Sequence, residues 1–269
     1  MSFALSGKTA IVTGAANGLG LAIARHFIDK GANVMFADID EDRLTDEVGQ
    51  EARADGPVRM FAGDLCQKLT IANLLSATMD AFDRIDILVN GSRVIQPSDP
   101  LNPDEDAVEA MLKQNLMTAL RLSQMTARRM IQQAARAETA EASTGSIINL
   151  SSLSAQRVQR GLLGYAISAA AVEQMTRAMA VELAPRHIRV NAVAFGSVLS
   201  GSLQGALKEM PDARDAIVAG TPLGRIAPAT EIAETVQFLA SDASAFMTGQ
   251  VLVLDGGRSL LDCVAPPMH

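Results

Sequence analysis

Aromatic and metal-binding side chains are scarce in this sequence. Among its 269 residues there is no tryptophan, one tyrosine (Tyr165) and three histidines. His26, His187 and His269 share no spacing with one another or with carboxylates that would assemble a set of metal ligands. We therefore expect no metal site, and any chemistry that needs a phenol must use Tyr165.

Cysteine is also rare, and long apolar runs are missing. Cys66 and Cys263 lie far apart, which argues against a disulfide framework or a cysteine metal site and favours a reducing compartment. Residues 1–10 lack the basic and then apolar character of a signal peptide, and no apolar run is long enough to cross a bilayer. We expect a soluble, cytoplasmic protein with no membrane partner.

Positive charge is in deficit. The chain has 23 basic and 30 acidic residues, a formal charge of −7 and a pI near 5.0, which argues against a nucleic-acid partner. Apolar residues make up 48% of the chain and charged residues 20%, which allows a sizeable core, and no linker divides the chain. We expect a single domain over residues 1–269.

Short apolar runs alternate with amphipathic segments from one end of the chain to the other. Near-continuous apolar strands separated by helices are typical of a parallel sheet covered on both faces. The predicted fold class is α/β, a single doubly wound domain with about seven parallel strands flanked by helices on both faces. The expected strands are residues 8–14, 33–38, 58–64, 85–90, 146–152, 188–196 and 250–257, and the first helices are 18–31, 41–54 and 68–82.

Two regions depart from this rhythm. Residues 121–144 favour a helix with a polar end, which we expect to extend into solvent. Residues 197–229 form a segment punctuated by glycine, serine and proline before the final helix. Ligands of doubly wound sheets bind beyond the carboxyl ends of the strands, so this segment is a candidate substrate lid, with an ordinary surface connection as the alternative. It carries few charges, which favours an uncharged substrate.

The stretch TGAANGLG (13–20) joins the first expected strand to the first expected helix. Glycines in such a turn let the backbone approach a diphosphate, whose charge is favoured by the helix N-terminus. We expect the diphosphate of a dinucleotide to be bound there by Gly14, Asn17, Gly18, Leu19 and Gly20. A purely structural turn is the alternative.

Two acidic residues close the next strands. Asp38 can accept hydrogen bonds from both ribose hydroxyls of an adenosine and would repel a 2′-phosphate, which favours NAD(H) over NADP(H). The alternative for Asp38 is a helix N-cap. Asp64 is placed to meet the edge of the adenine, with a cap or turn residue as the alternative.

Taken together, these segments resemble the short-chain dehydrogenase/reductase family in its compact single-domain branch, over nearly the whole chain. The resemblance is carried by TGAANGLG, FADID (36–40), GDL (63–65), LVN (88–90), QNL (114–116), INLSS (148–152), Tyr165, VELAPRHIRVNAVAFG (181–196) and FLASDASAFMTGQVLVLDGG (238–257). It implies a Rossmann-like sheet, a homotetramer, and hydride transfer between nicotinamide and an alcohol or ketone substrate. Further cofactor contacts are expected from Ile39, Leu65, Asn90, Gly91, Tyr165, Gly196, Val198 and Ser200.

The resemblance also implies three catalytic roles. Tyr165 is the expected acid/base toward the substrate oxygen, because hydride transfer to a carbonyl leaves an alkoxide that must receive a proton. Ser152 is expected to orient that oxygen, and Asn115 to hold a helix kink and a water in the proton path. The alternatives are a core tyrosine, a strand-end turn serine and a surface amide.

The sequence departs from the family pattern at three places. Where the family has Tyr-x-x-x-Lys, this chain has Ala169 in place of the lysine. An ammonium about 5 Å from a phenolate would stabilise it by roughly 3 kcal/mol at an effective dielectric of about 20, and alanine supplies none of this. Asn-Asn-Ala-Gly becomes Asn90-Gly91-Ser92-Arg93, and Phe195 replaces a proline. Arg93 either points to solvent, crowds the site or, less well, compensates for the lysine. Because several positions differ, we favour natural divergence over one engineered change.

These features leave three functions open. The first is an NAD(H)-dependent oxidoreductase impaired by the missing lysine. The second is a nucleotide-binding pseudoenzyme or assembly subunit without turnover, and the third is another reaction, such as dehydration or isomerisation, on the same scaffold. Ser152, Tyr165 and Asn115 favour the first, whereas Ala169 and Arg93 favour the second.

Overall fold

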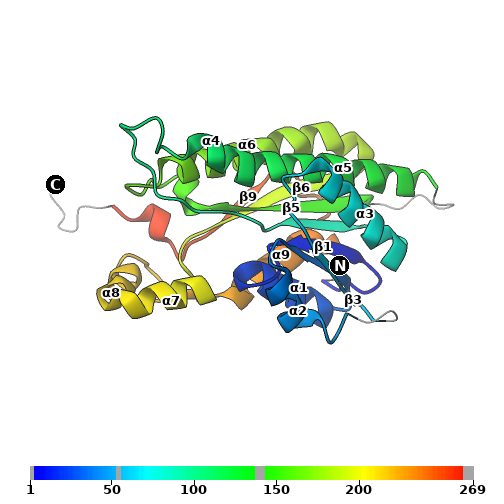
Figure 1. Ribbon diagram of the computed structural model, residues 1–269, viewed down its shortest axis with the longest axis horizontal. Coiled ribbons are helices and arrows are strands. Elements are labelled where there is room, and N and C mark those ends of the chain that lie inside the picture. Colours follow the sequence, from blue (N-terminus) through cyan, green and yellow to red (C-terminus); the bar gives the residue numbers. More distant parts are fainter. Residues whose placement is uncertain (1–2, 53–55, 137–142, 263–269) are drawn as a thin grey trace.

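One seven-stranded sheet organises the molecule. The computed structural model describes residues 3–52, 56–136 and 143–262. All six pairings in the sheet are parallel, and the strand order is β3-β2-β1-β4-β5-β6-β9 (Figure 1). The strands are β1 Thr9–Thr13, β2 Asn33–Asp38, β3 Val58–Ala62, β4 Ile87–Asn90, β5 Gly145–Ser152, β6 Ile188–Phe195 and β9 Val251–Leu254. The predicted fold class is confirmed.

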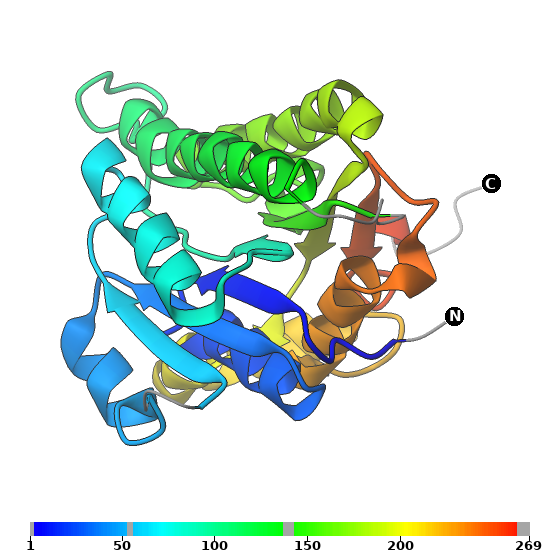
Figure 2. The same cartoon turned by 90° about the vertical axis from the view of Figure 1, so that its right-hand side faces the viewer.

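Helices cover both faces of the sheet (Figures 1 and 2). One face carries α1 Gly18–Asp29, α2 Glu41–Val48 and α9 Ala229–Ala240, and the other carries α3 Lys68–Phe82, α5 Thr118–Ala134 and α6 Leu163–Leu183. Successive strand residues point to opposite faces. In β1, Val12 therefore packs with the first group of helices and Ile11 with the second. Apolar side chains on both faces explain why the strands read as continuous apolar runs.

Several element ends differ from those predicted. Helix α2 ends at Val48, short of the predicted residue 54, because its apolar positions end there with the buried Leu44 and Val48. Helix α5 ends at Ala134, and the predicted polar extension falls partly on residues 137–142, outside the described residues. It is preceded by the short α4 Val108–Met111 and by a π-helical turn, Leu112–Met117.

The segment after β6 is largely helical. It contains β7 Val198–Leu199, α7 Gly201–Glu209, α8 Pro211–Ala219 and β8 Ala227–Pro228. Strands β7 and β8 pair in parallel as a small separate sheet. Helices α7 and α8 lie at one end of the molecule (Figure 1, lower left). The remaining short helices are Leu153–Ala155, Ala184–Arg186, Asp242–Ser244 and Arg258–Leu260.

The chain direction across the sheet reverses between β1 and β4. From β1 the chain proceeds outward to β2 and β3, then returns to β4 on the other side. The loops after β1 and β4 therefore leave the sheet in opposite directions, and a crevice opens outside the carboxyl ends of these strands. No helix within the described ranges is long and apolar enough to span a bilayer.

Candidate active site

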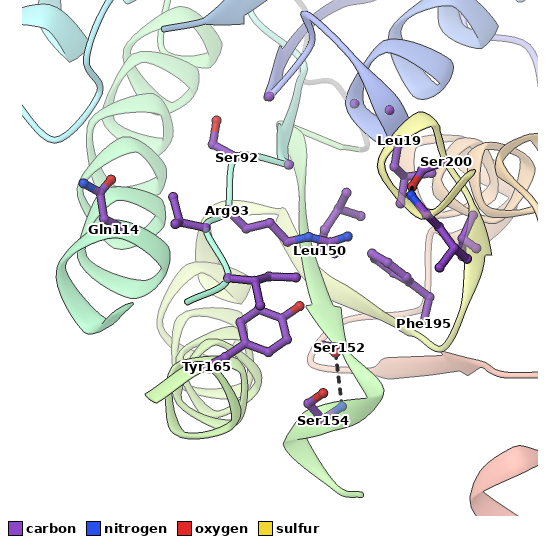
Figure 3. Close-up of a pocket in the computed structure, with 18 of the residues that line it drawn as sticks. Leu19, Ser92, Arg93, Gln114, Leu150, Ser152, Ser154, Tyr165, Phe195 and Ser200 are labelled. Carbon is purple, nitrogen blue, oxygen red and sulfur yellow. Dashed lines mark hydrogen bonds between the residues drawn. The ribbon is translucent and has the colours of Figure 1, made fainter. Parts of the chain in front are cut away.

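This crevice forms a large cavity. Its volume is about 870 Å³, within the range of about 300–1,000 Å³ of small-molecule sites. Figure 3 shows part of its wall. It is lined by nearly all the residues expected to act on cofactor or substrate: Gly14, Asn17, Gly18, Leu19, Gly20, Asp38, Ile39, Asp64, Leu65, Gly91, Ser152, Tyr165, Gly196, Val198 and Ser200. Asn90 and Asn115 are the exceptions.

The glycine turn after β1 is held by close backbone packing. A Cβ on Gly20 would lie 2.0 Å from the Gly14 carbonyl oxygen, and a Cβ on Gly14 would lie 2.9 Å from the carbonyl oxygen of Gly91. Gly14 and Gly18 also have φ values of +70° and +55°, which favour glycine. Glycine is therefore favoured at these three positions. Gly18, Leu19 and Gly20 line the cavity, and the first N–H groups of a helix have no partner within it, so this end of α1 suits an anion.

Asp38 supports the same turn. Its Oδ2 accepts a hydrogen bond from the Ala16 N–H at 3.0 Å, and its Oδ1 accepts from Ile39 N–H at 2.7 Å. The N-cap of α2 is Asp40, whose side chain accepts from the Arg43 N–H. The helix-cap alternative for Asp38 is therefore wrong, and its carboxylate remains on the cavity wall.

Asp64 makes a tight turn at the cavity wall. Its Oδ1 accepts a hydrogen bond from the Cys66 N–H at 2.9 Å, and this bond is the main reason that the pKa of Asp64 lies below its usual value. Asp64 is therefore a turn residue, as the alternative proposed, and it also lines the cavity.

Ser152 and Tyr165 come from neighbouring elements. Ser152 ends β5, and Tyr165 lies in the first turn of α6. Both are buried, at 9% and 5% exposure, yet both line the cavity. The Ser152 Oγ accepts a hydrogen bond from the Ser154 N–H at 3.1 Å, which leaves its own proton free for an oxygen acceptor. Figure 3 shows the Tyr165 hydroxyl directed toward Ser152.

Asn115 lies behind the cavity wall, in the π-helical turn before α5. Its Oδ1 accepts from the Val94 N–H at 2.8 Å, and its Nδ2 donates to the Val94 carbonyl oxygen at 3.0 Å and to the Ser168 Oγ at 3.1 Å. Because it is 7% exposed, the surface-amide alternative is wrong. Asn115 lies in a π-helical turn between α4 and α5, and its amide ties the loop after β4 to α6.

Asn90 is also behind the wall. Its Nδ2 donates to the Ser123 Oγ at 2.9 Å and to the Asn149 Oδ1 at 2.7 Å. These buried partners hold the side chain behind the wall of the large cavity, which Asn90 does not line, and its expected contact with a cofactor stays a prediction. Its neighbour Gly91 does line the cavity.

The comparisons with known proteins agree with this geometry. A family model described as enoyl-(acyl carrier protein) reductase matches residues 14–259. The chain belongs to the short-chain dehydrogenase/reductase family. Members of this family are oxidoreductases that act on alcohol and carbonyl substrates with NAD(P) as cofactor.

Similar proteins match nearly end to end. The 3-oxoacyl-(acyl-carrier-protein) reductase of Thermotoga maritima is 34% identical over 94% of this chain and 98% of its own length. The L-fucose dehydrogenase of Mus musculus is 32% identical over 95% of this chain and 89% of its own length. The structure of a gluconate 5-dehydrogenase from Burkholderia cenocepacia in complex with NADP and tartrate has a TM-score of 0.84 at 27% identity, and covers 97% of this chain and 98% of its own.

Ala169 borders a second, much smaller cavity in this family member. The residue is 6% exposed and lies one helical turn after Tyr165. The small cavity has a volume of about 20 Å³ and is lined by both residues, together with Arg93, Asn115 and Ser168. A water needs about 10–15 Å³, so the space left by the short side chain holds about one water. The cavity connects the helix face of Tyr165 to the loop after β4.

Two of the departures from the family pattern contact each other. The guanidinium carbon of Arg93 lies 4.4 Å from the centroid of the Phe195 ring. Figure 3 shows the Arg93 side chain crossing the cavity above Leu150 toward Phe195. Such a cation–π contact contributes about 0.5–1 kcal/mol at an exposed site. Arg93 is exposed and also lies on the cavity wall, so its contact with Phe195 fits crowding of the site and leaves the side chain accessible to solvent.

Two further arginines line the cavity and were missed by the sequence analysis. Arg157 donates from Nη2 to the carbonyl oxygen of Ser259, and Arg258 donates from Nη1 to the Ser197 Oγ at 3.3 Å. Both follow the carboxyl end of a strand, Arg157 after β5 and Arg258 after β9. Position after a strand end was the signal that could have found them.

Charge is unevenly distributed along the cavity. Its acidic lining residues are Asp38, which ends β2, and Asp64, which follows β3. Its arginines, Arg93, Arg157 and Arg258, follow β4, β5 and β9. Within the described ranges, no group of three or more histidine, cysteine, aspartate or glutamate side chains is arranged to hold a metal ion.

Proposed function

We propose that this protein is an NAD(H)-dependent oxidoreductase that interconverts an alcohol and a carbonyl, at a rate lowered by the missing lysine. The observation that carries the proposal is the shared cavity of the glycine turn, Ser152 and Tyr165. A dinucleotide bound at the turn would extend toward the two hydroxyls, with its nicotinamide supplying or accepting the hydride.

The residues present fit such a cofactor. The glycine turn lets the diphosphate reach the start of α1, where a Cβ on Gly14 or Gly20 would collide with backbone. The Asp38 carboxylate accepts only part of its possible hydrogen bonds from backbone N–H groups, so ribose hydroxyls can donate to it. Its charge disfavours a 2′-phosphate, which supports NAD(H) even though one structural relative binds NADP.

The proton chemistry rests on two hydroxyls. Ser152 donates its free proton to the substrate oxygen and fixes its position, while Tyr165 gives a proton to the alkoxide during reduction and takes one from the alcohol during oxidation. Ala169 leaves the tyrosine without a nearby ammonium to stabilise the phenolate. We therefore expect slow turnover with the roles of the remaining residues unchanged.

The domain organisation, the lid and the oligomeric state are also proposals. We infer one NAD(P)-binding domain over residues 1–269 in which residues 197–229 act as the substrate lid, supported by Leu203 of α7 and Ile217 of α8 on the cavity wall. We also propose a cytoplasmic homotetramer. Exposed apolar side chains such as Phe246, Val253 and Leu260 support burial against other copies, which light scattering would test.

Two measurements test the function. NADH and NADPH are titrated by cofactor fluorescence, and an alcohol and ketone panel is then assayed across pH. We expect tighter binding of NADH than of NADPH, slow turnover, and loss of that turnover in Tyr165→Phe with NADH binding retained. A preference for NADPH would refute the role of Asp38. Turnover that survives Tyr165→Phe would refute the role of the phenol.

A non-catalytic nucleotide-binding protein is the second candidate. The observation that favours it is the Arg93 side chain stacked on Phe195 across the cavity. Arg93→Gly separates the two candidates. If Arg93 only obstructs an intact site, the variant turns over faster than the parent protein. If the protein has no catalytic role, NADH binding changes while turnover stays absent on the whole panel.

A further inference from the structure

We propose that the substrate carries a carboxylate, which is bound by Arg157 and Arg258 at the end of the cavity beyond Ser152. This inference rests on the proposed oxidoreductase function and names the class of its substrate: small hydroxy acids and the corresponding keto acids. It revises the expectation of an uncharged substrate that the low charge of residues 197–229 suggested.

The two guanidinium groups are held in place by neutral acceptors. Arg157 donates to the carbonyl oxygen of Ser259, the residue after Arg258, and Arg258 donates to the Ser197 Oγ. The first contact places the Arg157 guanidinium beside the backbone of the residue that follows Arg258, and both arginines line the same cavity although they are far apart in the sequence. Each guanidinium has five N–H donors, so most donors of each group remain for a ligand.

Within the described part of the chain, neither arginine is in an ion pair. The ion pairs recorded there involve Arg25, Arg43, Arg84, Arg177 and Arg225. The acid nearest in sequence, Asp255, uses its carboxylate to accept from the Gly257 and Ser259 N–H groups. With Arg93 also on the wall, this end of the cavity concentrates positive charge in a chain of net charge −7. Such a cleft attracts an anion.

The order of the strands separates this charge from the expected diphosphate position. The glycine turn follows β1, whereas Arg157 follows β5, two strands away, and Arg258 follows β9, four strands away. Neighbouring strands are about 4.8 Å apart, so the two loops start about 10 Å and about 19 Å from the turn. Ser152 ends β5, five residues before Arg157. The arginines therefore belong to the substrate end.

The chemistry suits this placement. A guanidinium binds a carboxylate through two parallel hydrogen bonds, which fixes both position and orientation. The carboxylate itself does not react. In oxidation, the carbinol C–H hydride would pass to the oxidised cofactor and the hydroxyl proton to the Tyr165 phenolate, which becomes the phenol. The carbinol carbon becomes a carbonyl, and the carboxylate charge serves recognition alone.

The test uses matched probes. Lactate, 3-hydroxybutanoate and 4-hydroxycyclohexanecarboxylate are each compared with their methyl esters, by kcat/KM with NAD⁺ and by calorimetric binding to the protein saturated with NADH. We expect at least one acid to exceed its ester about tenfold or more. Arg157→Gln and Arg258→Gln should each raise the KM of that acid about tenfold, a larger change than in its kcat or in the KM of its ester. Arg160→Gln is the control, because Arg160 is exposed on the same loop and does not line the cavity.

Three results would overturn the inference: equal use of acids and esters, no calorimetric binding of any acid, or arginine variants that weaken NADH binding. The last would assign the arginines to the cofactor diphosphate. Calorimetric binding distinguishes a failure of this inference from a failure of the proposed oxidoreductase function. If acids bind calorimetrically and lose binding in Arg157→Gln, yet nothing turns over, the carboxylate site stands and the oxidoreductase activity does not.

Discussion

Ala169→Lys would place a cation on the helix face that carries Tyr165. Residues four apart on a helix are neighbours, and long side chains on a helix point toward its N-terminus. The new ammonium would therefore extend toward Tyr165 rather than toward the buried Glu173, one turn further on. Its path leads into the small cavity that both residues 165 and 169 line.

Charge interactions decide the size of the effect. An ammonium about 5 Å from the phenolate, at an effective dielectric of about 20, stabilises it by about 3 kcal/mol, which is about a hundredfold in rate if proton transfer limits turnover. Two features oppose this gain. The cavity of about 20 Å³ is too small for a lysine side chain unless its lining moves, and Arg93, which lines it, adds a like charge. At about 6 Å that repulsion is also about 3 kcal/mol.

The expected result is therefore a dependence on Arg93. Ala169→Lys alone should raise kcat by less than about tenfold, whereas Ala169→Lys combined with Arg93→Gly should approach about a hundredfold. The assay is steady-state oxidation with NAD⁺ across pH, with NADH affinity measured by fluorescence for each variant. A double variant that binds NADH normally and turns over no faster than the parent protein would refute the assigned role of Tyr165.

Three other predictions follow from named contacts. Gly20→Ala places a Cβ 2.0 Å from the Gly14 carbonyl oxygen. We expect the free energy of unfolding, measured in urea, to fall by about 3 kcal/mol, and NADH binding to weaken. Gly205→Ala is the control, because Gly205 has open space around it, and it should not lower the stability. Burial raises the pKa of the Cys66 thiol. In a Cys263→Ser background, iodoacetamide should therefore alkylate Cys66 slowly at neutral pH and faster at alkaline pH. Because Cys66 lines the cavity, bound NADH should slow this alkylation further. Fast alkylation at pH 7 would contradict this. For Asp255, burial acts to raise the pKa, but hydrogen bonds from the Ser259 side chain and from the Ser259 and Gly257 N–H groups outweigh it and lower the pKa below the usual value. The ionised Asp255 should then contribute its full stabilisation above about pH 4 and lose it as the pH falls through the lower pKa of the folded state. The difference in unfolding free energy between the parent protein and Asp255→Asn should therefore close in acid. A difference that persists there would contradict this assignment.

The placement of most site residues was predictable because regular elements direct their side chains. Apolar runs broken by glycine predicted the strands, and the carboxyl ends of parallel strands meet at one edge of a sheet. Asp38, Ser152 and the glycine turn were therefore expected at one crevice, and they line one cavity. Asn90 also ends a strand, but buried partners on β5 and α5 hold its amide behind the cavity wall.

The amino-acid sequence by itself determined the doubly wound sheet, the glycine turn, and the presence of Ser152, Tyr165 and Ala169 at their positions. Only the tertiary structure decided that Arg93 lies on Phe195 and that Arg157 contacts Ser259 beside Arg258. The physical reason is that a strand or helix directs its side chains by its own period. A long, flexible arginine in a loop is instead positioned by whatever distant segment the fold brings within its reach.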